Sequence, residues 1–413
     1  MKLNIVRIRH NFSIYSYLIG LTIVIIPLIN RQNNNNYLML LGYIVILFHA
    51  LKNSYFEKDI RDYILMPLTM FVSAFLFNPT EARLSTILYS CMFIWGFLAF
   101  KSSLKRSNLC IDDFLNLLKI LVLAYAVVLA IQITESFLGI TNIINLNSDM
   151  SSKFKMNSLT WESSNTLLIV PLYMYTYFKL LEIKRSKKIT ITYLFSKEKL
   201  FIFLSLFICF CSGSMTVFFT VPILFLYILR IKNILFILTL LTIITFIIIQ
   251  ISKLGGLNID RFTKFMNILF TFNAETIIRT DPSSATRIVP FFIYANSINL
   301  LDTTFWFGHG IDAMDKTITQ QIFWYRTDND YDMVQVGNIL SVCYNYGVFT
   351  MITFLLFLRK YALSRWLSFD TFFYITVFSI ITINHYLIWL FISLLYITKY
   401  YKVNINKSSI NEQ

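Results

Sequence analysis

The stretch ILFILTLLTIITFIIIQI, residues 234 to 251, decides the fold class of this chain. Its apolar residues follow one another without regular alternation, over about the length that a helix needs to cross a bilayer. Within lipid, backbone polar groups must find partners inside a helix or in a closed barrel. Barrel strands alternate apolar and polar residues, so this pattern predicts a transmembrane helix.

The same composition extends along the whole chain. Of the 413 residues, 56% are hydrophobic and only 14% are charged, whereas about a quarter of the residues in a soluble domain are charged. We therefore expect an all-α polytopic integral membrane protein with about twelve transmembrane helices. The expected spans are residues 14–29, 37–51, 62–78, 84–100, 115–134, 162–181, 199–212, 214–229, 233–251, 335–358, 368–383 and 385–398.

Basic residues predict how these helices are oriented. The formal net charge is +14, and lysine and arginine gather in alternate connectors, as they do in the cytoplasmic loops of membrane proteins. Both ends of the chain belong to this basic set. We therefore expect a multi-pass protein of the cytoplasmic (inner) membrane with both termini in the cytoplasm. Because the charge follows the topology, no nucleic acid is expected as a partner.

Two connectors on the opposite side are too long to be simple turns. Residues 135–161 form an outer loop within the first nine helices (residues 1–251), and residues 252–335 precede the last three (residues 336–398), which a cytoplasmic tail, residues 399–413, follows. Loops longer than about 15 residues without structure of their own are uncommon unless they are functional. We expect the second connector to be a helical extracytoplasmic subdomain.

The second outer loop begins with cations beside an apolar helical pattern. In NIDRFTKFMNILFTF (258–272), Arg261 and Lys264 flank apolar residues at helical spacing. This pattern is typical of an amphipathic helix that lies on the membrane surface with its cations near lipid head groups. The alternative is a helix packed on the spans with solvated charges.

An arginine follows a helix start in DPSSATRIVPFF (281–292). Asp281 and Pro282 are favoured at the cap and the first residue of a helix, and Arg287 comes within two turns. A helix N-terminus and an arginine can together hold a pyrophosphate. The alternative is that Arg287 pairs with Asp281 or Asp302 and only shapes the loop.

The segment WFGHGIDAMDK (306–316) places His309 between two glycines. Histidine exchanges protons near neutral pH, although a single loop histidine more often has a structural role. Asp312 and Asp315, three residues apart, are expected to share a helical face and to be available as bases. No residue pattern in the chain requires a metal or another cofactor.

The first outer loop ends with a cation and an acid, Lys155 and Glu162. Glu162 begins the sixth expected span near the membrane interface, where a charged group is costly unless it is paired or used. It is a candidate base, and the structural alternative is that it caps the helix, since acids are favoured at helix N-termini.

At these residues the chain resembles the O-antigen polymerases and O-antigen ligases of bacterial surface-polysaccharide assembly. Arg287 stands about twenty residues before the Gly308-His309-Gly310 turn, and a span then opens with VGNILSVCYNYGVFTMITFLLFL (336–358). In that span, Asn338 and the Tyr346-Gly347-Val348 triplet are similar to the family's pattern. Many spans, cytoplasmic ends and one large outer loop before the last helices are similar to the family's architecture.

The resemblance implies a membrane glycosyltransferase that acts without a metal on the outer face. It would transfer a glycan from undecaprenyl pyrophosphate to a sugar hydroxyl of another lipid-linked repeat unit, building O-antigen, capsule or exopolysaccharide. Its implied partners are this lipid-linked oligosaccharide, membrane lipids, and a chain-length regulator and a flippase of the same pathway. The implied site residues are Arg287, Arg279, Lys264, Arg261 and Lys155 for the pyrophosphate, Arg287, His309 and Glu162 for catalysis, and Asp312, Asp315 and Asn338 as bases or acceptor contacts.

Two departures from the family pattern bear on this expectation. Met215 stands where many members have arginine, and Gly337 stands where ligases usually have histidine. The second favours a polymerase over a ligase, which remains the alternative within the family. A flippase of lipid-linked oligosaccharide is the alternative from another class, although transporters concentrate polar groups at mid-membrane depth and these spans carry few charges.

Overall fold

The computed structural model describes residues 2–23, 37–53, 60–138, 156–160, 162–212, 214, 216–229, 273–280, 282–325, 339–379 and 381–411. The regular structure of these residues is helical. In the first half the helices are α1 (Lys2–Gly20), α2 (Tyr37–Lys52), α3 (Ile60–Phe71), α4 (Leu84–Arg106), α5 (Ile111–Leu138), α6 (Ser163–Arg185), α7 (Ile191–Lys197), α8 (Lys199–Cys211) and α9 (Val217–Leu229). In the second half they are α12 (Ala274–Thr280), α13 (Pro282–Ser297), α14 (Thr303–Phe307), α15 (Ala313–Tyr325), α16 (Leu340–Tyr361), α17 (Phe369–Phe373) and α18 (Tyr386–Asn411).

Four of these helices, α4, α5, α6 and α16, are long and apolar enough to cross a membrane. The shortest of them has 22 residues, which at about 1.5 Å per residue is roughly 33 Å, enough for the hydrocarbon core of a bilayer. The all-α class predicted for a membrane protein is therefore confirmed. The number of twelve spans stays a prediction, and the expected span at 233–251 lies outside the described residues.

Some helices differ from their predicted bounds and others agree with them. α3 continues as a π-helix, Val72–Phe77, and then a 3-10 turn, Pro79–Glu81. α8 and α9 are separate helices, as predicted around residue 214. α18 continues through most of the segment predicted as a tail. Helix-forming lysines within it allow the helix to extend past the apolar run that hydropathy detects.

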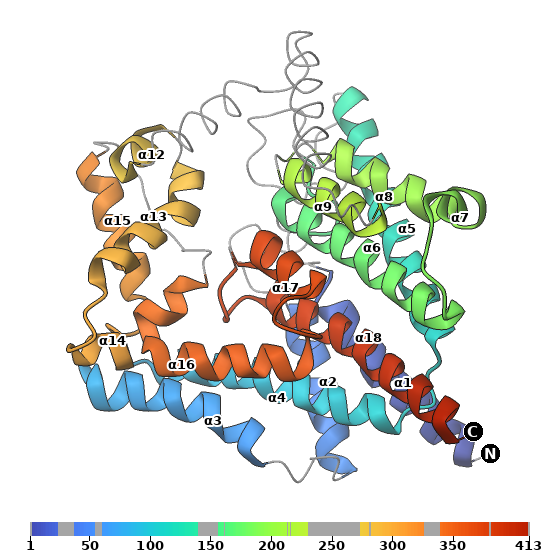
Figure 1. The fold of residues 1–413 in the computed structure, drawn as a ribbon, viewed down its shortest axis with the longest axis horizontal. Coiled ribbons are helices and arrows are strands. Elements are labelled where there is room, and N and C mark those ends of the chain that lie inside the picture. The colour runs from blue at the N-terminus through green and yellow to red at the C-terminus, as the bar shows by residue number, and fades with distance from the viewer. Residues whose placement is uncertain are drawn as a thin grey trace.

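The helices are arranged so that the small helices between residues 274 and 325 gather at one end of the molecule. Figure 1 shows α12, α13, α14 and α15 together at the left, where α3 ends and α16 begins. Both chain termini lie at the lower right of the same view. Within this group, α12, α13 and α15 share a small apolar core of their own, built around Ile277, Val289 and Met314. The main core contains large aromatic side chains such as Phe93, Phe97 and Trp389.

The opposite end of the bundle holds ion pairs between helices. Lys360, at the end of α16, lies 2.6 Å from Asp62 at the start of α3. Lys179 of α6 lies 2.5 Å from Asp370, and both side chains are mostly buried. Lys399 of α18 donates to backbone carbonyls near the end of α16, including that of Lys360 at 2.8 Å. Basic residues that the sequence assigns to one side of the membrane thus meet at one end of the bundle.

Candidate functional site

The candidate site lies where the Gly308-His309-Gly310 turn meets residues 344–347 of α16, a contact that we call the glycine junction. α14 leads into the turn. Asp302 caps this helix, its carboxylate accepting the Thr304 N–H at 3.0 Å, and that bond lowers the pKa of Asp302. The helix ends at Gly308, whose N–H donates to the Thr304 carbonyl at 2.8 Å. A short capped helix therefore delivers the turn to α16.

Backbone hydrogen bonds join the turn directly to α16. The N–H of His309 donates to the Tyr344 carbonyl at 2.8 Å, and the N–H of Gly310 donates to the Asn345 carbonyl at 3.1 Å. α16 is broken at Gly347, whose φ of 82° and ψ of 171° are not helical. Because a break in a helix interrupts its ladder of hydrogen bonds, these carbonyls can accept donors from another segment.

Two glycines make this close approach possible, one on each side of the junction. Gly308 has a φ of 81°, and a Cβ there would lie 2.6 Å from the Tyr346 nitrogen. A Cβ on Gly347 would lie 2.5 Å from the Phe307 nitrogen. Both backbones therefore need glycine for conformation and for space. Gly308 leaves space for the backbone of α16, and Gly347 leaves space for the backbone of α14.

The ring of His309 is held in a defined orientation. It stacks on the Tyr344 ring with centroids 4.2 Å apart and planes 10° apart, and its Nδ1 lies 3.2 Å from the Tyr344 carbonyl oxygen. Since a carbonyl oxygen only accepts, this hydrogen bond requires the proton on Nδ1. In neutral His309, Nε2 is then the atom that can take a proton from a substrate.

Asn345 and Asp312 fix the start of the next helix. Asn345 Oδ1 accepts the N–H of Met314, in the first turn of α15, at 2.9 Å. Asp312 has a left-handed φ of 59° and pairs with Arg83 at 3.3 Å. The prediction that Asp312 and Asp315 share a helical face is therefore wrong, because α15 begins between them and only Asp315 is helical.

Residues that follow α3 hold the backbone of the turn in place through hydrogen bonds and an aromatic contact. The hydroxyl of Ser73 donates to the Phe307 carbonyl, and the amide of Asn78 donates to the Gly308 carbonyl at 3.2 Å. The rings of Phe77 and Phe307 stack with centroids 3.7 Å apart. Ser73 and Phe77 belong to the π-helical segment, an irregularity that often marks functional regions. Sequence reasoning missed these residues and Arg83, since their partners are more than 200 positions away in the chain.

Glu162 lies at the start of α6, as the sequence predicts. It is the exposed N-cap residue, but its carboxylate makes no capping bond to the helix backbone and instead accepts the Ser164 hydroxyl at 2.8 Å. It lies near the side chain of Tyr386, at the start of α18. Just before that helix, Asn384 accepts the Ser90 hydroxyl of α4 at 2.5 Å and lies near the Tyr346 hydroxyl. The structure thus brings Glu162 to the same end of the bundle, with no described contact between it and His309.

The predicted pyrophosphate ligands are only partly described. Arg279 of α12 pairs with Glu275 one turn earlier, at 2.9 Å, and both side chains are exposed. Arg287 lies within α13, which begins at Pro282 as predicted, and the structure describes its backbone only. Outside the described residues lie the other three predicted pyrophosphate ligands, Lys155, Arg261 and Lys264. Asn338, predicted as a base or acceptor contact, also lies outside them.

The small apolar core of α12, α13 and α15 contacts the junction at Tyr344 and, through Met314, at Asn345. Tyr344 packs against the apolar cluster that α12, α13 and α15 form, and its ring stacks on the His309 ring. α13, with Arg287, is therefore tied to the helix that orients His309. Among the described residues, no group of three His, Cys, Asp or Glu side chains is placed to hold a metal ion.

Comparison of this chain with protein-family models, with curated proteins and with solved structures finds no match.

Proposed function

We propose that the protein is a polysaccharide polymerase that joins lipid-linked repeat units at the end of the bundle where α12–α15 gather. The observation that carries this proposal is the orientation of His309. Its ring is stacked on Tyr344 and its Nδ1 is bonded to a carbonyl, so a single nitrogen is left as a proton acceptor. The side chain is half-buried, which suits a group that must meet a substrate.

The proposed reaction is a transfer between two lipid-linked glycans. A hydroxyl of the acceptor sugar attacks the anomeric carbon of the donor sugar, forming the new glycosidic bond. The bond from that carbon to the pyrophosphate oxygen breaks, and undecaprenyl pyrophosphate leaves with the bonding electrons. The hydroxyl proton goes to Nε2 of His309 or to the carboxylate of Glu162, both of which are suitable general bases.

The departing pyrophosphate needs positive charge placed where its negative charge develops. We assign this role to Arg287 of α13, because Arg279 of α12 already forms an ion pair with Glu275. Its helix, α13, is bound to Tyr344 through the shared apolar core. The cation and the base would then be positioned by the same part of α16.

The experiment is a complementation test in a strain that lacks the native gene, with gel profiling of its surface polysaccharide. Arg287→Ala and His309→Ala should each leave single repeat units on the final acceptor, at wild-type protein levels in the membrane. Asn296→Ala and Thr303→Ala are matched controls, because both residues are exposed on α13 and α14, and these strains should make normal polymer.

Other outcomes assign other functions. Full-length polymer that stays on the lipid and never reaches its acceptor indicates a ligase. Repeat units trapped on the cytoplasmic face indicate a flippase. Normal chain lengths in both variants would remove Arg287 and His309 from the reaction and would refute the proposal.

A further inference from the structure

A polar segment lies just before α18, at the same end of the bundle as the glycine junction. In residues 381–386, Thr382, Asn384, His385 and Tyr386 are half-buried, so each side chain is held by the fold and still partly open to a ligand. The segment contains no lysine, arginine, aspartate or glutamate. Its polar side chains are therefore hydroxyl, amide and imidazole groups, which bind ligands by hydrogen bonds.

Buried groups fix this segment in the bundle. The indole N–H of Trp389, in the first turn of α18, donates to the Ile383 carbonyl at 2.8 Å. Asn384 Oδ1 accepts the hydroxyl of the buried Ser90, on α4, at 2.5 Å. Because these side chains are already in place, a ligand would lose little free energy in ordering them.

The segment lies between the two candidate bases of the proposed reaction. On one side, Asn384 lies near the hydroxyl of Tyr346, in the glycine junction. On the other side, Tyr386 lies near Glu162, at the start of α6. The segment is therefore adjacent both to the junction that orients His309 and to Glu162.

The ring of His385 presents a hydrogen-bond donor. Its Nδ1 accepts the N–H of Leu387, in the first turn of α18, at 3.3 Å. An imidazole nitrogen that accepts a hydrogen bond carries no proton, so the ring is neutral and its proton is on Nε2. The ring stacks on that of Tyr386 with centroids 4.5 Å apart, and in the described part of the chain its Nε2 has no hydrogen-bond partner. His385 thus offers a donor where His309 offers an acceptor.

These groups suit the hydroxyls of a sugar better than they suit a phosphate. Phosphate is typically bound through lysine or arginine, and the segment has neither. The carboxylate of Glu162, near Tyr386, adds negative charge that disfavours an anion. A sugar hydroxyl both donates and accepts, so it can bond to amide, imidazole and carboxylate groups.

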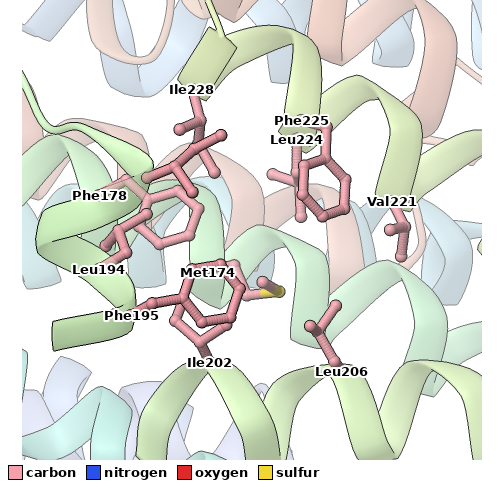
Figure 2. A pocket seen from close by; sticks show the side chains of 11 residues that line it. Met174, Phe178, Leu194, Phe195, Ile202, Leu206, Val221, Leu224, Phe225 and Ile228 are labelled. Atoms are coloured by element: carbon pink, nitrogen blue, oxygen red, sulfur yellow. The ribbon is translucent and has the colours of Figure 1, made fainter. Parts of the chain in front are cut away.

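An apolar pocket elsewhere in the bundle offers no alternative place for a sugar. Figure 2 shows this pocket among α6, α7, α8 and α9, lined by apolar side chains such as Met174, Phe178 and Leu206. Its volume is about 20 Å³, room for a single water molecule. A sugar would neither fit there nor find partners for its hydroxyls.

We propose that Asn384 and His385 bind the acceptor sugar of the lipid-linked repeat unit. His385 donates from Nε2 and Asn384 donates from its amide, both to hydroxyl oxygens of the sugar. This site rests on the proposed function, and it adds to that function the residues that recognise the acceptor. It holds the acceptor between His309 and Glu162, apart from the cations that bind the pyrophosphate of the donor.

The test uses the full chain, purified in detergent and supplied with lipid-linked repeat units extracted from a strain that lacks the gene. Polymer formation is measured with two competitors, the repeat-unit oligosaccharide released from its lipid pyrophosphate and inorganic pyrophosphate. His385→Phe keeps an aromatic ring against Tyr386 but removes the donor. The free oligosaccharide should therefore inhibit this variant roughly three- to tenfold more weakly than the wild type, the ratio that one hydrogen bond provides. Inhibition by inorganic pyrophosphate should stay unchanged, which a general disturbance of the site would not allow.

Three further variants complete the test. His385→Gln should be inhibited by the oligosaccharide like the wild type, because the glutamine amide places an N–H near the position of Nε2. Asn384→Asp keeps an oxygen for the Ser90 hydroxyl but loses the amide donor, so it should weaken inhibition by the oligosaccharide as His385→Phe does. His49→Phe is the matched control and should change neither inhibition. His49 is another half-buried histidine whose Nδ1 is bonded to a neighbouring side chain, that of Asn53, near the end of α2.

Failure of the sugar site and failure of the proposed function give different results. Wild-type protein that forms no polymer from the lipid-linked units refutes the proposed function, on which the sugar site rests. If the wild type forms polymer but the free oligosaccharide does not inhibit it, or inhibits His385→Phe just as strongly, the sugar site is refuted and the polymerase stands. If His385→Phe does not fold, unchanged inhibition of Asn384→Asp refutes the sugar site in its place.

Discussion

Replacing Gly347 by alanine should open the glycine junction without unfolding the helix bundle. The backbone there has φ 82° and ψ 171°, a region that is essentially restricted to glycine and costs other residues about 1–3 kcal/mol. The added Cβ would also lie 2.5 Å from the Phe307 nitrogen, so the two segments must separate. Separation breaks the hydrogen bonds from His309 and Gly310 to α16, each contributing roughly 0.5–1.5 kcal/mol.

These terms together predict a loss of roughly 2–6 kcal/mol, concentrated at the junction. Amide hydrogen exchange measures it, because the N–H groups of His309 and Gly310 are protected by the bonds that would be lost. A loss near 3 kcal/mol should accelerate their exchange by roughly a hundredfold. Ile352→Ala is the control, since it changes an exposed side chain of the same helix. Exchange at wild-type rates in Gly347→Ala would refute the described contact between the turn and α16.

Three further predictions concern side chains around the junction and at the other end of the bundle. Asn345→Ala should remove the hydrogen bond that caps α15 and destabilise that helix by about 1 kcal/mol. The amide hydrogens in the first turn of α15 should then exchange faster. Unchanged exchange rates would show that Asn345 does not cap the helix. Arg83→Ala should lower the unfolding free energy by at most about 1 kcal/mol, because the Arg83 side chain, which pairs with Asp312, is 57% exposed. A larger loss of stability in thermal denaturation would mean that Arg83 has another partner. Lys179→Met should destabilise the fold by about 3–5 kcal/mol, because it leaves the buried Asp370 carboxylate without the cation that pairs with it. Adding Asp370→Leu should recover most of the lost thermal stability.

The sequence predicts the long helices well and their junctions poorly, for physical reasons. α4, α5 and α6 lie close to their expected bounds because continuous apolar runs identify a buried or lipid-facing helix directly. The bend at Gly347 is set instead by the approach of Phe307 from another part of the chain. Asp312 shows the same limit, since its spacing from Asp315 suits one helix while the backbone there is left-handed. Contacts between residues far apart in the chain, such as Gly347 and Phe307, leave no periodic signal in the sequence.

The two glycine-containing motifs of the junction are one structural unit in this chain. The Gly308-His309-Gly310 turn and the Tyr346-Gly347-Val348 triplet look independent in the sequence, and either glycine alone would be an ordinary loop or helix residue. In the structure, Gly308 leaves room for the backbone of α16 and Gly347 leaves room for the backbone of α14. A side chain at either position would push the same two segments apart. Gly308 and Gly347 therefore act together. Both are needed for the close contact between the turn and α16, and this contact orients the His309 ring.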